Sequence, residues 1–198
     1  MDLFSNIPKS FEIANCKIEL QENFLSKETA DRLFSSLLEL DWKQEYINIM
    51  GKTHPIPRLT YWFSKENKSY VYSGIRVDPV PFSEEIEFIC SKIEAAYNKK
   101  FNSVLLNLYR DGKDSVAWHS DDEASLGSNI NVASYSLGES RKFQLRENKP
   151  GSEIHSISLQ HNSLLFMHHP TQERLIHQIP KSTSSSEPRI NLTFRYIS

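Results

Sequence analysis

The sequence predicts an α+β fold in which two helices are followed by a sandwich or jelly roll of short strands. Before about residue 100, apolar residues recur every three or four positions in two segments, which is the period of a helix. Beyond Lys100 they occur in short runs separated by turn-forming dipeptides, which is typical of strands. A series of seven or eight such strands buries its apolar faces best in two packed layers.

The first predicted helix covers residues 27–40. Ser26 stands where its hydroxyl can accept a hydrogen bond from a free amide of the first turn. The apolar positions that follow fall on one side of the helix and are Ala30, Leu33, Phe34, Leu37 and Leu38. This stripe gives the helix one face to bury.

The second predicted helix covers residues 84–98, with Ser83 as its cap and acidic residues in its first turn, where negative charge is favourable. Its apolar face consists of Ile86, Ile89, Cys90, Ile93 and Tyr97. Cys90 is therefore expected to be a core residue, and it forms no metal-spaced pair with the distant Cys16.

The predicted strands are short and largely apolar, and they cover residues 104–109, 130–137, 142–146, 153–159, 163–167, 175–179 and 189–197. Asp111-Gly112, Leu137-Gly138 and Pro150-Gly151 mark turns between them. The serine-rich run 182–186 is predicted to be a flexible loop. No internal repeat or domain boundary interrupts the pattern, so we expect the 198 residues to form one domain.

Composition narrows the classes of partner and location. The formal net charge is −2, so any contact with nucleic acid would have to come from a local basic patch or from base stacking. The first residues lack the basic-then-apolar order of a signal peptide, and no apolar run approaches the length of a membrane span. We therefore expect an intracellular, soluble monomer, in the cytoplasm or the nucleus, that does not bind membranes.

The strongest functional signal is the run of residues 189–195. Alternate side chains of a strand point to opposite faces, so its three apolar residues would share one face and its polar residues the other. The polar face would hold Arg189, Asn191, Thr193 and Arg195. Two buried guanidiniums would need anionic partners, and the fork of an arginine suits a carboxylate or a phosphate. The alternative is a half-exposed edge strand with a solvated face.

A second signal is His119-Ser120-Asp121. If the chain is extended from Val116, one imidazole and one carboxylate converge on the same point. A further imidazole would complete the 2-His-1-carboxylate set that holds Fe(II) with open positions for a co-substrate and oxygen. The later histidines that could supply it are His155, His161, His168, His169 and His177.

With these motifs in this order, the chain resembles the AlkB family of Fe(II)- and 2-oxoglutarate-dependent dioxygenases, and within it the duplex-active nucleic-acid dealkylation repair homologues. The resemblance extends from about Ile49 to Arg195, and Asn107-Leu108-Tyr109 matches a further motif of the family. It implies a double-stranded β-helix over about residues 101–198. Flanking helices and a nucleotide-recognition lid are expected in about residues 1–100.

The resemblance also implies the metal and co-substrate sites. His119, Asp121 and His177 are the expected catalytic Fe(II) ligands; His177 is chosen because its distance from Arg189 along the chain is that of the relatives. His168 and His169 lie in a turn and are not expected to bind metal. The expected 2-oxoglutarate contacts are Asn107, Tyr109, Arg189, Asn191, Thr193 and Arg195, with Arg189 on the distal carboxylate and Arg195 steadying Asp121.

For function, the resemblance implies oxidative demethylation of N1-methyladenine and N3-methylcytosine in DNA, with release of formaldehyde, succinate and CO2. Tyr70 and Tyr72 are expected to line the base pocket, where an extruded base needs an aromatic face on which to stack. Glu123 is expected to face the base, because a carboxylate suits a cationic lesion; otherwise it is a solvated loop acid. The aromatic run 61–63 is expected to pack within an ordinary strand.

The segments 49–52 and 56–58 resemble the finger hairpin of duplex-active relatives, with Met50 as a wedge in the base stack and Arg58 as a further substrate contact. Alternatively, Met50 packs on its own hairpin. Those relatives carry basic residues before the last strand, where this chain has Lys181 and then serines, so strand preference stays open. Candidate replacements for the phosphate contacts are Arg110, Arg141, Lys142, Arg146 and Lys149.

Two other functions stay open. One is a dioxygenase of the same family that acts on RNA or on a protein side chain. The other is a non-catalytic nucleic-acid binder, which the complete set of expected ligands and arginines disfavours.

Overall fold

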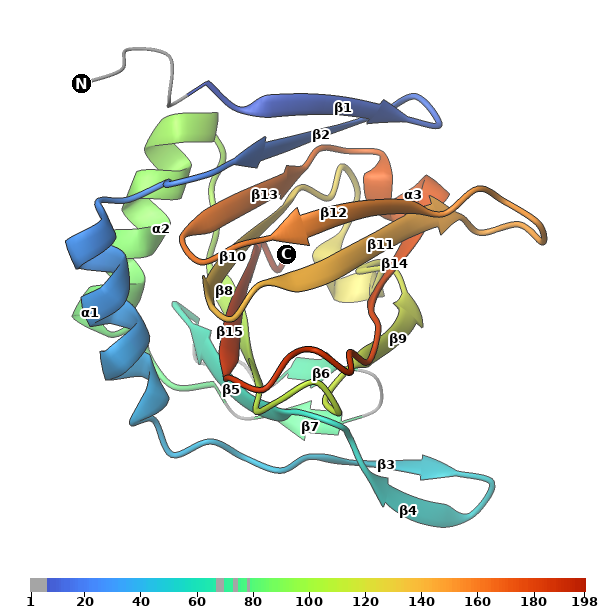
Figure 1. Cartoon of the computed structure of the whole chain (residues 1–198), viewed down its shortest axis with the longest axis horizontal. Coiled ribbons are helices and arrows are strands. Elements are labelled where there is room, and N and C mark those ends of the chain that lie inside the picture. Colours follow the sequence, from blue (N-terminus) through green and yellow to red (C-terminus); the bar gives the residue numbers. More distant parts are fainter. Residues whose placement is uncertain (1–6, 67–69, 73–74, 78) are drawn as a thin grey trace.

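The computed structural model describes residues 7–66, 70–72, 75–77 and 79–198. Its centre consists of two antiparallel sheets that face each other, with two helices outside the larger one (Figure 1). The larger sheet has the strand order β1-β2-β13-β10-β15-β8-β5, and the smaller has the order β12-β11-β14-β9. This arrangement is a double-stranded β-helix, so the predicted fold class is confirmed.

The strands of the larger sheet are β1 (Lys9–Ile13), β2 (Cys16–Gln21), β5 (Leu59–Ser64), β8 (Ser103–Tyr109), β10 (Val132–Gly138), β13 (Ser163–Met167) and β15 (Arg189–Arg195). Those of the smaller sheet are β9 (Val116–His119), β11 (Arg141–Glu147), β12 (His155–Leu159) and β14 (Leu175–Ile179). Two hairpins stand apart from both sheets: β3 (Tyr46–Ile49) with β4 (Lys52–Pro55), and β6 (Tyr70–Tyr72) with β7 (Ile75–Val77).

Both predicted helices are present, as α1 (Lys27–Leu38) and α2 (Glu84–Tyr97). Ser26 caps α1 by accepting a hydrogen bond from the Thr29 amide at 3.2 Å, and Ser83 caps α2 in the same way. A short helix, α3 (Thr171–Arg174), follows β13. None of the helices in the described part of the chain is long and apolar enough to cross a bilayer.

Alternation along the strands separates two apolar cores. On β13, Leu164 and Phe166 face α1 and α2, whereas Leu165 and Met167 face the smaller sheet. Cys90 is fully buried in the core beneath the helices, as predicted. The second core lies between the sheets, and the polar end of that inter-sheet space holds the site described below.

The double-stranded β-helix is not confined to the residues after about 100, because strands from the first part of the chain belong to its larger sheet. β1, β2 and β5 come from the first part of the chain and extend the larger sheet at its two edges. β2 joins this sheet by pairing with β13, far away in the sequence. This long-range pairing leaves no local signal, so the place of β2 in the sheet could not be predicted. β1 forms a local hairpin with β2, and neither strand was predicted from the sequence.

Candidate active site

The polar face of β15 lies inside the molecule. β15 pairs with β10 on one side and β8 on the other, and all seven of its residues are buried, so the edge-strand alternative is wrong. Its apolar residues enter the core beneath the helices. Its polar residues, Arg189, Asn191, Thr193 and Arg195, line a pocket between the two sheets.

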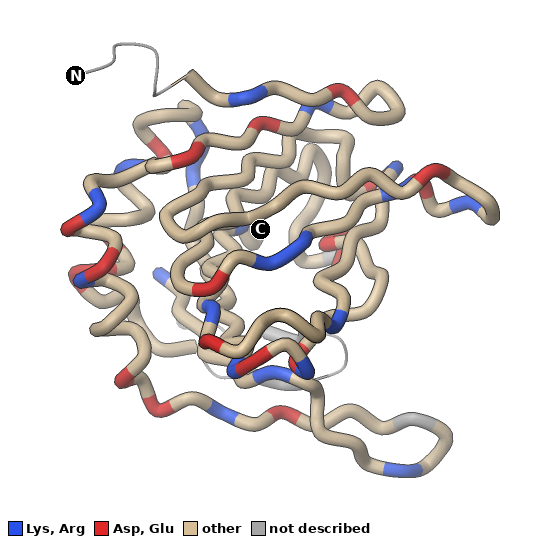
Figure 2. Tube along the Cα trace, in the orientation of Figure 1, with Lys and Arg blue, Asp and Glu red and all other residues tan. Residues whose placement is uncertain are grey.

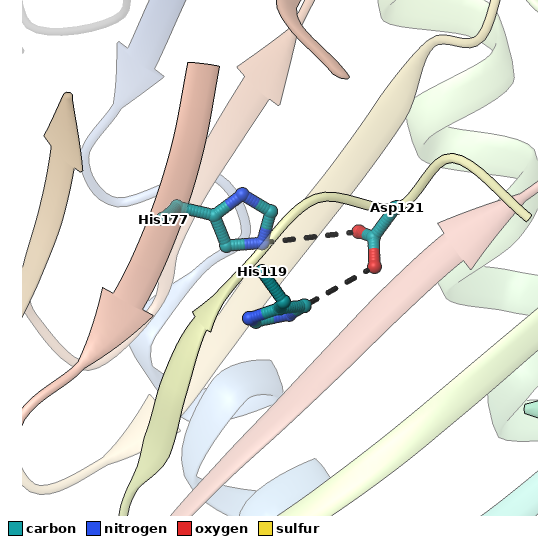
Figure 3. A group of neighbouring side chains, drawn as sticks. All are labelled: His119, Asp121 and His177. Atoms are coloured by element: carbon teal, nitrogen blue, oxygen red, sulfur yellow. Dashed lines mark ion pairs between the residues drawn. The ribbon is translucent and has the colours of Figure 1, made fainter. Parts of the chain in front are cut away.

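Three potential metal ligands meet at the mouth of this pocket (Figure 3). His119 ends β9 and stands directly opposite His177 of β14, while Asp121 follows β9 by two residues. One ligand atom from each residue lies within 4.8 Å of the others. Asp121 Oδ1 is 3.9 Å from His119 Nε2, and Asp121 Oδ2 is 4.0 Å from His177 Nε2. Two imidazoles and one carboxylate form a donor set that suits Fe(II).

The surroundings prepare both imidazoles for metal binding. His119 Nδ1 donates to the Ala117 carbonyl at 2.8 Å, which leaves Nε2 free as a ligand atom. Burial lowers the pKa of His177 to about 3, so this ring is neutral at physiological pH. The ring of Phe143 stacks on His177 with centroids 5.2 Å apart and holds its orientation.

Asp121 is fixed through its side chain and its backbone. Arg195 Nη2 donates to Asp121 Oδ1 at 2.6 Å, and the Asp121 amide donates to Gln172 Oε1 at 3.0 Å. Burial opposes ionisation of this carboxyl, but the charge and hydrogen bond of Arg195, together with the two neighbouring histidines, outweigh it and keep the pKa of Asp121 below its ordinary value. Asp121 is therefore a carboxylate, as a metal ligand must be.

Arg189 provides an anion site deeper in the same pocket. It is 1% exposed, and its Nη2 donates to Ser136 Oγ at 2.9 Å and to Asn191 Oδ1 at 3.0 Å. Within the described residues, its Nε and Nη1 are buried and have no hydrogen-bond partner. Burial lowers the pKa of Arg189 to about 10, so it is still a cation at neutral pH. Two unsatisfied donors on a buried cation fit a carboxylate of 2-oxoglutarate.

The other expected co-substrate contacts surround this guanidinium. Asn191 accepts from Ser134 Oγ and donates to Thr193 Oγ1, each at 2.7 Å. Tyr109 places its ring 5.2 Å from the Arg189 guanidinium carbon. Asn107 accepts from Arg58 Nε at 2.8 Å. All of these residues line the pocket.

Arg58 also lines a second, larger cleft of about 510 Å³ that opens beside His119. Most of the other residues of this cleft come from β9, from the end of β14 and from the base of the β3–β4 hairpin, and they include Ile47, Ile56, Trp118, Gln178 and Lys181. Trp118 was not singled out from the sequence. The only signal for it was that it directly precedes His119 in an extended segment.

The remaining histidines lie away from the metal ligands. His168 Nε2 is 2.5 Å from Glu19 Oε2, His169 pairs with Glu173, and His161 with Asp31. Within the described residues, His119, Asp121 and His177 are the one group of three residues that could hold a metal ion.

The residues expected to contact the base lie on the β3–β4 and β6–β7 hairpins and in the segment after β9. Met50 stands at the tip of the β3–β4 hairpin and is 99% exposed, so it does not pack on its own hairpin. Glu123 lies outside both cavities. Within the described residues, its buried Oε2 has no hydrogen-bond partner, and burial raises the pKa of its carboxyl.

The side chains of Tyr70 and Tyr72 lie outside the described part of the structure. Tyr61, Trp62 and Phe63 form part of β5, as expected.

Four of the five expected phosphate contacts have partners within the fold. Arg146 donates to the Lys149 carbonyl at 3.2 Å, and Lys149 pairs with Glu147 at 3.0 Å. Arg141 is 3% exposed and donates to the carbonyls of Asp111, Asp114 and Pro180. Arg110 donates through two nitrogens to the Asp114 carboxylate, at 2.8 Å each. The buried Arg141 cannot reach a phosphate, and that expectation for it is wrong.

A double-stranded β-helix with this donor set and a buried arginine beside it defines the class of Fe(II)- and 2-oxoglutarate-dependent oxygenases. Comparison with known proteins agrees: residues 17–195 match the family model of the 2OG-Fe(II) oxygenase superfamily. The solved structure of OsALKBH1, at 14% identity, superimposes with a TM-score of 0.67 over 95% of this chain and 100% of that one, which shows the fold.

Sequence relatives define the family within this class. Alpha-ketoglutarate-dependent dioxygenase alkB homolog 3 is 39% identical in mouse and 38% in human, each match covering 91% of this chain and 66% of the relative. The human DNA oxidative demethylase ALKBH2 is 33% identical over 86% of this chain and 70% of its own length. The chain belongs to the AlkB family. It spans slightly less than two thirds of the alkB homolog 3 proteins. Its pocket fits the Fe(II) and 2-oxoglutarate that the family model names.

Proposed function

We propose that this protein removes methyl groups oxidatively from N1-methyladenine and N3-methylcytosine in DNA, as one catalytic domain, and so repairs alkylation damage. The observation that carries the proposal is the buried Arg189 with two open donors, placed in the same pocket as the three potential ligands of Fe(II). The name of the relative ALKBH2, a DNA oxidative demethylase, supports DNA as the substrate.

His119, Asp121 and His177 would hold Fe(II), and Arg189 would hold the distal carboxylate of 2-oxoglutarate. When bound, the metal with its co-substrate and O2 supplies the oxidising power that hydroxylates an N-methyl carbon, and the co-substrate leaves as succinate and CO2. The hydroxymethyl group is then lost as formaldehyde, which restores the base.

The residues of the chain do the positioning. Arg195 holds Asp121 as a carboxylate, and the Ala117 carbonyl sets the tautomer of His119. The cleft beside His119, at about 510 Å³, lies within the usual size range of small-molecule sites and can hold one extruded base. We propose that Tyr70 and Tyr72 contact this base, with Arg58 at the boundary between the cleft and the co-substrate pocket. Glu123, which lines neither cavity, would reach the base from outside the cleft.

The experiment is succinate release by the iron-loaded protein in the presence of matched substrates. We expect an oligodeoxynucleotide that contains N1-methyladenine to stimulate release, and the unmethylated strand to leave it at the background rate. Stimulation by methylated RNA alone, or by a methylated peptide alone, would instead assign the site to the rival substrates of this family.

A further inference from the structure

A second depression, on the outer face of the smaller sheet, lies next to the cleft beside His119. This depression is lined by β11, β12 and the segment 180–184. Pro180 and Lys181 line both cavities, so the two lie side by side. Figure 2 shows a basic segment at the start of β11, on the face turned to the viewer.

Every charged side chain that lines these two cavities is a cation. They are Arg58, Arg141, Lys142 and Lys181, and no Asp or Glu is among the lining residues. Within the described residues, the ammonium groups of Lys142 and Lys181 have no ion-pair partner, whereas Lys149 pairs with Glu147 at 3.0 Å. Most of the other residues that line the depression are serines: Ser140, Ser156, Ser158, Ser182 and Ser184. In a chain with a net charge of −2, this surface selects a polyanion.

The wall of the depression is held in place by the turn after β8. The Ser182 amide donates to the Gly112 carbonyl at 2.8 Å, and the Gly112 amide donates to the Ser185 carbonyl at 2.9 Å. A Cβ atom on Gly112 would lie 2.0 Å from the Ser182 carbonyl oxygen, so only glycine permits this approach. Arg141 adds a hydrogen bond to the Pro180 carbonyl at 2.7 Å. The segment that carries Lys181 is therefore preformed.

An aromatic surface stands in the cleft wall. Trp118 is half-buried, and the guanidinium carbon of Arg146 lies 4.7 Å from its ring centroid. A cationic groove with a partly exposed aromatic ring is the combination that proteins use to bind single strands of nucleic acid, since phosphates pair with the cations and bases stack on the ring.

We infer that this surface, the strand groove (Trp118, Lys142, Lys181 and the serine hydroxyls), binds the backbone of a single polynucleotide strand on one side of the target nucleotide. The inference rests on the proposed function, because that function assigns the cleft beside His119 to the extruded target base. The occupant is identified by two observations: Lys142 and Lys181 complement a polyanion, and the depression shares Pro180 and Lys181 with the cleft.

The test compares the double variant Lys142→Ala/Lys181→Ala with Lys92→Ala/Lys99→Ala. The control removes the same charge from exposed lysines on and just after α2, outside both cavities. Binding of unmethylated single strands is measured by fluorescence anisotropy over a range of salt concentrations. We expect the groove variant to lose about tenfold in affinity for a long strand. Its slope of log K against log salt should fall by about 1.4, the value for two lost phosphate contacts.

A short oligonucleotide that reaches no farther than the cleft should bind the wild type and the groove variant equally. Equal losses in the groove variant and the control, or a loss seen only with duplex DNA, would overturn the inference. So would a wild-type protein that binds no single strand. Because the strands are unmethylated, the result does not depend on turnover: a protein that shows this pattern but releases no succinate retains the groove and refutes the proposed function.

Discussion

Arg195 and Asp121 join the co-substrate pocket to the metal ligands. Arg195 Nη2 donates to Asp121 Oδ1 at 2.6 Å, and the two side chains are 4% and 1% exposed. Arg195 lies on the same strand as Arg189, six positions further on, so a single strand carries the anion site and orients a potential ligand of the metal. Both sites therefore depend on the position of β15.

Replacing Arg195 with Met should weaken Fe(II) binding while the fold is kept. The Asp121 carboxylate would lose its charged partner and its fixed orientation, and loss of such a supporting contact weakens metal affinity by about ten- to a hundredfold. Iron titration of the apoprotein measures the change. Arg195→Lys should keep part of the affinity. Unchanged iron binding in Arg195→Met would show that Asp121 needs no such support.

Replacing His177 with Ala should abolish turnover and weaken iron binding, because it removes one of three protein ligands. His168→Ala and His169→Ala serve as controls, since these rings pair with Glu19 and Glu173 far from the site. Activity measured as formaldehyde release should survive in both controls. If His177→Ala is active and a control is not, the ligand assignment is wrong.

Arg189→Ala should raise the KM for 2-oxoglutarate steeply. A charge-assisted pair contributes about 1.5–3 kcal/mol, which corresponds to about ten- to a hundredfold in affinity. Arg189→Lys should restore only part, because an ammonium cannot reproduce the two-pronged contact. Steady-state kinetics with varied 2-oxoglutarate give the answer, and an unchanged KM in Arg189→Ala would remove this residue from the co-substrate site.

Met50→Ala should depress repair of duplex DNA far more than repair of single strands, because only a duplex leaves a gap to be filled when a base is extruded. The loss should be on the order of the few kcal/mol needed to unstack one base step. An exposed methionine at a hairpin tip has no packing to lose, so thermal stability should not change. Equal losses on both substrates would exclude the wedge.

Arg110→Met should make the protein more sensitive to acid. Burial opposes ionisation of Asp114, but Arg110 outweighs it and keeps the pKa of this carboxyl below its ordinary value. The pair therefore contributes stability above the ordinary pKa of an aspartate, and this stability is lost as the pH falls through the lowered value. In the variant, denaturant unfolding should show a lower free energy of unfolding at neutral pH and an acid transition at higher pH. An unchanged transition would mean that Asp114 is held by other groups.

The sequence was sufficient for the features that rest on local periodicity. The alternation of residues 189–195 separated the polar pocket face from the apolar core face, and the serines before both helices marked their caps. His119 and Asp121 could be paired by their spacing alone. The partner His177 could be chosen only by resemblance, because several later histidines could have supplied the second imidazole.

Features that depend on distant pairing could not be predicted. Arg141 has the sequence context of an exposed basic residue on a strand, yet it is buried because carbonyls of the turn after β8 and of Pro180 meet its guanidinium. Trp118 lines the cleft because β9 lies close to the end of the β3–β4 hairpin that joins the rest of the fold. Both contacts involve segments that are distant in the sequence, so the residues next to Arg141 and Trp118 do not predict them.

The most direct test of the account is a product balance on a single strand that contains N1-methyladenine, with the iron-loaded protein and 2-oxoglutarate. We predict that formaldehyde, succinate and unmethylated adenine appear in equal amounts, and that His177→Ala yields none of them. Succinate without restored adenine, or restored adenine in the absence of 2-oxoglutarate, would contradict the assignment.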